Sequence, residues 1–124
     1  MSQQKHLLAV IELGGYPDFT SLYESCGFTV HQVNSVRKAI RLMKQVSPDV
    51  IVAEFNFQSD FRDRTSSLES LLSGVQSTHH SKVIVFYEKE YSHQLERLTA
   101  QYPELICFPF PIEKEQLSAA ISDI

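Results

Sequence analysis

Apolar and polar positions follow two repeating patterns that alternate along the chain. Short, largely apolar runs rich in β-branched residues predict strands at residues 7–11, 28–33, 50–55, 83–86 and 105–108. Between these runs, apolar residues recur three and four positions apart, which is the spacing of one helix face. The clearest stripe is Val36, Ala39, Ile40, Met43 and Val46, and the last one runs over residues 113–124. The pattern therefore predicts five strand–helix units.

Local signals mark several of the predicted helix ends. Pro17 suits a first helical turn, and Gly27 is a natural C-terminal stop for that helix. Asn34 or Ser35 can cap the next helix, which the Ser-Pro pair at Pro48 ends. Both helices are therefore expected to be short and bounded by turns.

The alternation predicts an α/β fold, a doubly wound parallel sheet with right-handed crossovers and helices on both faces. The central runs are almost continuously apolar, as expected when both faces are covered, whereas the run at 28–33 alternates and is predicted at an edge. In such sheets the functional site lies beyond the carboxyl ends of the strands. Glu54, which follows the apolar run at 50–53, is therefore a candidate site residue.

Composition narrows the class of protein. The chain has 124 residues, 43% of them hydrophobic, and this predicts one domain with a core of its own. Because the sequence ends at the last helix, no output domain is expected within residues 1–124. The net charge of −4 argues against a large nucleic-acid interface.

The spacing of the cysteines and the length of the N-terminal apolar run indicate the cellular compartment. Cys26 and Cys107 show neither metal-ligand nor redox spacing and are interpreted as small core residues in a reducing environment. The N-terminal apolar run is too short for a signal peptide or a membrane span. We therefore expect a soluble, cytoplasmic protein that does not enter a membrane.

Three segments carry a resemblance to a known family. The segment "PDVIVAE" resembles the "PDLILLD" segment of bacterial response-regulator receiver domains, and "FPIEKEQLSAAI" is similar to their "KPFDPEELLAAI" ending. The segment "HLLAVIE" resembles their "ILIVDDE" opening. The resemblance implies a CheY-like domain of two-component signalling and phosphorelay. It also implies a flavodoxin-like (βα)5 sheet with strand order 2-1-3-4-5.

The resemblance also implies where the working residues of a receiver would lie. The family holds Mg²⁺ with an acidic pair, which falls here on Ile11 and Glu12. Its phosphorylated Asp falls on Glu54, and its Thr or Ser falls on Tyr87. Its Lys and the following cis-Pro fall on Phe110 and Pro111. The family's short Pro-containing loop is replaced by a longer charged one at residues 56–65.

These departures predict a degenerate phosphoacceptor site with no catalytic residue. Mg²⁺ needs oxygen ligands in near-octahedral geometry, and Ile11 offers none. Phosphoryl transfer depends on positioning and charge neutralisation, and Phe110 supplies no charge. Tyr87 and Phe110 are expected to fill the switch cavity with apolar rings. The chain is therefore interpreted as a pseudo-receiver rather than an enzyme, and no cofactor is expected.

Three interpretations of Glu54 remain open at this point. Its carboxylate is either the partly exposed end of a strand, a permanent stand-in for a phosphorylated Asp, or a true phosphoacceptor. Glu12 and Glu54 are also weak candidates for a divalent-metal pair. A separate alternative is a flavodoxin-like protein that binds a small ligand or metal in a cleft of Glu12, Gly14, Glu54 and Tyr87.

The favoured function is a phosphorylation-independent module that contacts another signalling protein. The family's common contact surface is the last helix with its neighbours. This gives the partner-contact candidates Leu95, Leu98, Phe108, Leu117, Ile121 and Ile124. A homodimer would use the same surface in a two-fold arrangement, and no nucleic acid or membrane is expected as a partner.

Overall fold

The fold is described from a computed structural model, which covers residues 5–11, 17–55, 68, 71–75 and 81–122. The five strands are β1 (Lys5–Val10), β2 (Phe28–Val33), β3 (Val50–Glu54), β4 (Lys82–Tyr87) and β5 (Ile106–Pro109). The helices are α1 (Thr20–Ser25), α2 (Val36–Met43), the short 3-10 helix η1 (Lys89–Tyr91), α4 (Ser92–Gln101) and α5 (Lys114–Ser122). Residues 71–75 are also helical.

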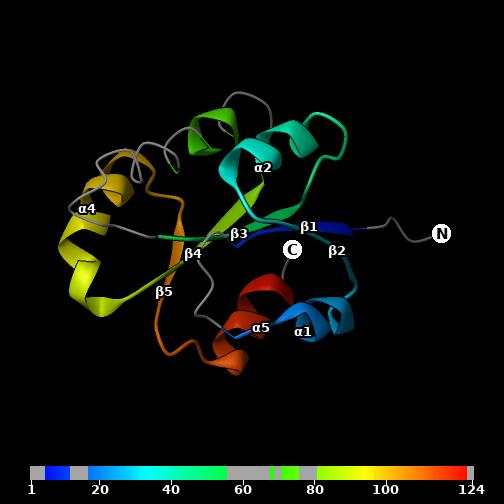
Figure 1. Cartoon of the computed structure of the whole chain (residues 1–124). Coiled ribbons are helices and arrows are strands. Elements are labelled where there is room, and N and C mark those ends of the chain that lie inside the picture. The colour runs from blue at the N-terminus through cyan, green and yellow to red at the C-terminus, as the bar shows by residue number, and fades with distance from the viewer. Residues whose placement is uncertain (1–4, 12–16, 56–67, 69–70, 76–80, 123–124) are drawn as a thin grey trace.

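The strands form one sheet in the order β2-β1-β3-β4-β5, and every pairing is parallel (Figure 1). This confirms the predicted strand order and places β2 at an edge, as its alternating pattern indicated. The parallel arrangement follows from the helices between successive strands, which carry the chain back across the sheet before the next strand begins.

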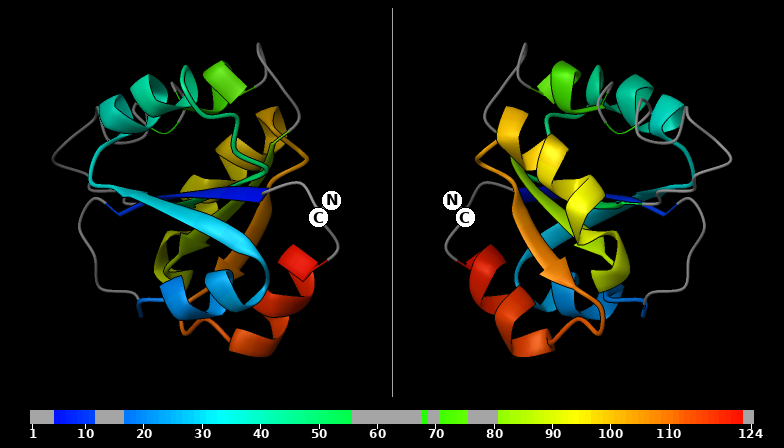
Figure 2. Two further views of the ribbon diagram at one scale, coloured as in Figure 1. Left: turned by 90° about the vertical axis from the view of Figure 1, so that its right-hand side faces the viewer. Right: turned by 90° about the vertical axis from the view of Figure 1, so that its left-hand side faces the viewer.

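The sheet separates two hydrophobic clusters. One face packs against α2, the helical residues 71–75 and α4, and the other face packs against α1 and α5 (Figures 1 and 2). The central strand β3 is buried along its whole length, because helices cover both of its faces. We call these two sides the α2 face and the α5 face.

The N-terminal ends of three strands are joined through Asp49. Its carboxylate Oδ2 accepts the backbone N–H of His6 at 2.9 Å, and its own N–H donates to the carbonyl of His6 at 2.8 Å. Its carbonyl accepts the N–H of Lys82 at 3.0 Å. Asp49 thus fixes the relative position of β1, β3 and β4 where these strands begin.

The first helix begins later than the sequence predicted. The expectation that Pro17 lies in its first turn is wrong, because α1 begins at Thr20. The carboxylate of Asp18 accepts both the N–H of Thr20 at 3.0 Å and its hydroxyl at 2.6 Å. This turn holds Pro17 and Asp18 outside the helix.

The predicted cap of the second helix is confirmed. Ser35 is extended at the N-cap of α2, and its hydroxyl accepts the N–H of Lys38 at 3.1 Å. This bond satisfies one of the N–H groups that have no partner within the helix.

Replacing this cap is expected to weaken the fold measurably. Ser35→Ala should lower the free energy of unfolding by about 1 kcal/mol, because alanine leaves the N–H of Lys38 without its acceptor. Ser35→Asp is the matched control and should retain most of the stability, since aspartate caps equally well. Urea denaturation measures both changes, and equal losses in the two variants would contradict a capping role.

Both cysteines are half-buried and carry free thiols. Burial raises the pKa of the Cys107 thiol, which keeps this side chain in its neutral form near neutral pH. Among the described residues, no helix combines the length and the apolar character that crossing a bilayer requires.

Candidate functional site

The last residue of β3 is a buried acid. Glu54 has only 7% of its surface exposed, although it lies at the carboxyl end of the strand. It pairs in register with Phe86 of β4, and strand alternation places it on the same side as Val52, which is the α5 face. The interpretation of Glu54 as a partly exposed strand end is therefore wrong.

Glu54 lines a small cavity between the ends of β1 and β3 and the start of α1. The cavity has a volume of about 30 Å³, room for about two water molecules. Its lining combines strand residues with the segment that enters α1. The lining residues are Ala9, Val10, Ile11, Pro17, Asp18, Phe19, Thr20, Tyr23, Gln32, Val52, Glu54 and Phe86.

A second acid, Asp18, lines the same cavity and was missed by the sequence analysis. Its carboxylate is exposed and accepts two hydrogen bonds from Thr20, which lower the pKa of Asp18. The signal that could have found it is the Pro-Asp-x-Thr spacing, which favours a local side-chain turn before a helix. The cavity is therefore acidic, with one carboxylate from β3 and one from the turn.

Aromatic rings form the apolar wall of the cavity. Phe19 meets Phe86 edge to face, with ring centroids 5.9 Å apart and an interplanar angle of 75°. Tyr23 packs beside Phe19, and burial, followed by the negative charge of Asp18, raises the pKa of the Tyr23 phenol. The phenol is therefore neutral, and this wall supplies no charge to balance the carboxylates.

The structure brings together only some of the positions that the resemblance implied. Ile11 and Glu54 line one cavity, as expected for positions that follow β1 and β3. Glu12 and Gly14 lie outside the described residues, so the Glu12–Glu54 metal pair and the ligand cleft remain predictions.

Tyr87 and Phe110 are not among the described residues that line this cavity, and their expected place in a switch cavity stays a prediction. Tyr87 packs against the cluster on the α2 face, whereas Glu54 lies on the α5 face. Phe110 is 42% exposed. Their backbones do meet, because the N–H of Phe110 donates to the carbonyl of Tyr87 at 2.8 Å. The peptide bond between Phe110 and Pro111 is cis, in agreement with the family position of this proline.

The predicted partner-contact residues are mostly core residues. Leu95 and Leu98 lie inside the cluster on the α2 face, and Leu117 and Ile121 lie inside the cluster on the α5 face, each at most 4% exposed. Phe108 is half-buried, and Ile124 lies outside the described residues. Any contact by α4 or α5 in this conformation must therefore use the exposed neighbours of these four side chains.

Ile11 contributes a hydrocarbon side chain to the cavity, and no Lys or Arg is among the described residues that line it. Within the described ranges, no three His, Cys, Asp or Glu side chains come together as a metal cluster.

Several solved structures share the fold. A response regulator receiver protein from Sinorhizobium medicae WSM419 matches with a TM-score of 0.67 at 24% identity, covering 97% of this chain and 92% of that one. A response regulator receiver domain from Clostridium thermocellum matches with a TM-score of 0.69 at 18% identity, covering 98% and 93%. A CheY-like receiver domain from Methylobacillus flagellatus matches with a TM-score of 0.68 at 18% identity, covering 98% of each.

These likenesses establish a receiver-like, flavodoxin-like fold. No protein-family model matches the chain, and no curated protein matches it either. The fold prediction is thus confirmed by structures of low sequence identity.

Proposed function

We propose that the protein is a phosphorylation-independent, receiver-like module of bacterial signal transduction that acts by contact with another protein. The observation that carries the proposal is the burial of Glu54, which occupies the family's phosphoacceptor position in the resemblance. Glu54 is 7% exposed, and the cavity beside it has a volume of about 30 Å³. An acceptor must instead present its carboxylate to an incoming phosphoryl group and its metal ion.

No Lys or Arg is among the described residues that line the cavity beside Glu54. The developing negative charge must be neutralised by a metal ion or a positioned cation. The described lining offers aromatic rings, aliphatic side chains and a second carboxylate, Asp18. An ionised glutamate carries a charge of about one, against nearly two for a phosphoryl group. A glutamate at this position is permanent, whereas a phosphoryl group is added and removed.

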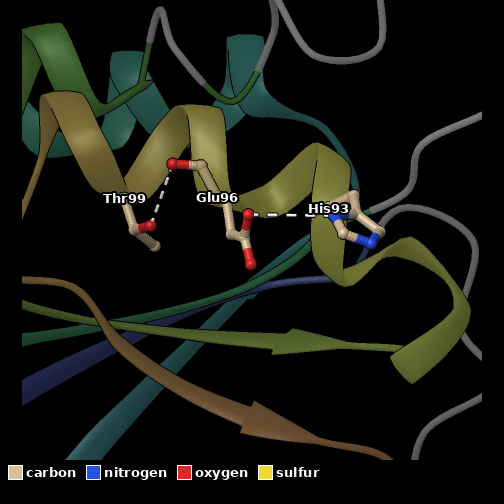
Figure 3. A network of polar contacts seen from close by, with 3 residues as sticks. All are labelled: His93, Glu96 and Thr99. Carbon is tan, nitrogen blue, oxygen red and sulfur yellow. Dashed lines mark hydrogen bonds and ion pairs between the residues drawn. The ribbon is translucent and has the colours of Figure 1, made fainter.

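The surface proposed for partner contact lies on the exposed side of α4, with β5 and α5 beside it (Figure 2). On α4, Nδ1 of His93 lies 3.8 Å from Oε1 of Glu96, and the hydroxyl of Thr99 donates to the carbonyl of Glu96 at 3.1 Å (Figure 3). The side chains of His93 and Glu96 are 91% and 72% exposed. Such an exposed pair adds little to stability, so its side chains are available to a partner.

Affinity capture from the source organism tests the proposal. Tagged wild-type protein should retain the same partner with and without acetyl phosphate. The double variant Glu96→Lys/Arg97→Glu, which inverts two exposed charges on α4, should lose it. The matched control Glu24→Lys/Arg41→Glu makes the same charge changes on α1 and α2 and should retain it. Capture that requires acetyl phosphate, or that only the control variant abolishes, would contradict the proposal.

A further inference from the structure

Two histidines of neighbouring strands lie with ring nitrogens in contact, away from the Glu54 cavity. Nδ1 of His6 in β1 is 3.0 Å from Nε2 of His31 in β2, and the ring centroids are 5.2 Å apart. The register explains this proximity. His31 pairs with Leu8, and Leu8 lies two residues from His6, so both histidines are on the α2 face.

The backbone at this pair is fixed while the rings reach solvent. His6 is bound to Asp49 through both its N–H, at 2.9 Å, and its carbonyl, at 2.8 Å. His31 is held in the ladder between β1 and β2. Both histidines are half-buried, so their side chains lie partly open to solvent.

The separation of the nitrogens suits a shared metal ion. An ion at roughly 2.05 Å from each imidazole nitrogen holds the two nitrogens about 2.9 Å apart at a right angle, and about 3.3 Å apart at the tetrahedral angle. The observed 3.0 Å is close to the right-angle value. Tetragonal geometry with nitrogen ligands is typical of Cu²⁺ and Ni²⁺.

We propose that His6 and His31 bind one late first-row transition-metal ion of the Cu²⁺ or Ni²⁺ type. The ion takes the lone pairs of His6 Nδ1 and His31 Nε2, and each neutral ring carries its proton on its other nitrogen. Water fills the remaining positions. The site is not expected to bind Mg²⁺ or Ca²⁺, because these ions require oxygen donors. The inference is independent of the proposed signalling role.

Calorimetric titration of the full chain with NiCl₂ is the first test. The wild type should bind one ion per chain and give no binding heat with MgCl₂. His6→Asn and His31→Asn should each weaken nickel binding by at least about 10- to 100-fold, the loss that even outer-shell changes produce. Two matched controls, His93→Asn and His79→Asn/His80→Asn, remove imidazoles elsewhere in the chain and should leave the affinity unchanged.

Nuclear magnetic resonance of the wild type tests nickel binding by His6 and His31 even if a variant fails to fold. Substoichiometric Ni²⁺ should broaden the ring signals of His6 and His31 before those of the other histidines. Broadening of His79, His80 or His93 first would overturn the proposal, as would binding that survives both single variants. The absence of any nickel binding would also overturn it and leave the pair as a hydrogen bond between strands.

Discussion

Acetyl phosphate and Mg²⁺ are expected to leave the wild-type protein unphosphorylated. Three features act against the same transition state. By the family resemblance, Ile11 stands where a metal carboxylate would lie and Phe110 stands where a Lys would lie. Glu54 is buried and one methylene longer than aspartate. Mass spectrometry of the intact protein measures the result, with a working receiver domain treated in parallel as the control for the reagent.

Restoring one residue of this group is expected to recover almost no phosphorylation. Residues that act together in one site are strongly non-additive, so Glu54→Asp alone should stay inert. The combined variant Ile11→Asp, Glu54→Asp, Tyr87→Thr and Phe110→Lys tests whether the backbone still has the geometry of a receiver. A phosphoryl group on the wild type, mapped to Glu54, would place the protein among the regulators that work by phosphorylation.

Truncation of Leu117 is expected to lower the free energy of unfolding by as much as core truncations of leucine usually do. Leu117 is fully buried in the cluster on the α5 face. Leu117→Ala should therefore lower the free energy of unfolding by about 2–5 kcal/mol, because it removes apolar contacts and leaves a cavity. Urea denaturation measures this loss as a shift of the midpoint.

The neighbouring residue provides the matched control. Gln116 is exposed on the same helix, and Gln116→Ala should change stability by less than about 0.5 kcal/mol. If Leu117→Ala instead left stability unchanged and abolished partner capture, Leu117 would be a surface contact, as its apolar character alone had suggested.

The sequence predicted the sheet well because its signals are local. Continuous β-branched runs at β3 and β4 indicated buried parallel strands, and the alternating run of β2 indicated an edge. Ser35 was recognised as a cap because its hydroxyl needs only the next turn of helix. The start of α1 was missed because a competing turn at Asp18 uses hydrogen bonds that helical periodicity does not reveal.

The candidate site was predicted less well because it depends on register. The pairing of Glu54 with Phe86, rather than with Tyr87, places the acid and the phenol on opposite faces of the sheet. No spacing within a single strand contains that information. The partner-contact residues illustrate a different error. The apolar stripes of α4 and α5 were interpreted as a docking surface, whereas the same stripes attach these helices to the sheet.

The outer edge of β5 limits how another chain can approach. Because the N–H of Phe110 points inward to Tyr87, alternation directs the nitrogen of Pro109 outward, where proline has no hydrogen to donate. Within the short strand Ile106–Pro109, Cys107 is then the residue whose backbone N–H points away from the sheet. Such an edge resists both aggregation and the addition of a sixth strand. A partner that binds on this side must therefore contact side chains of the helices rather than form backbone hydrogen bonds with β5.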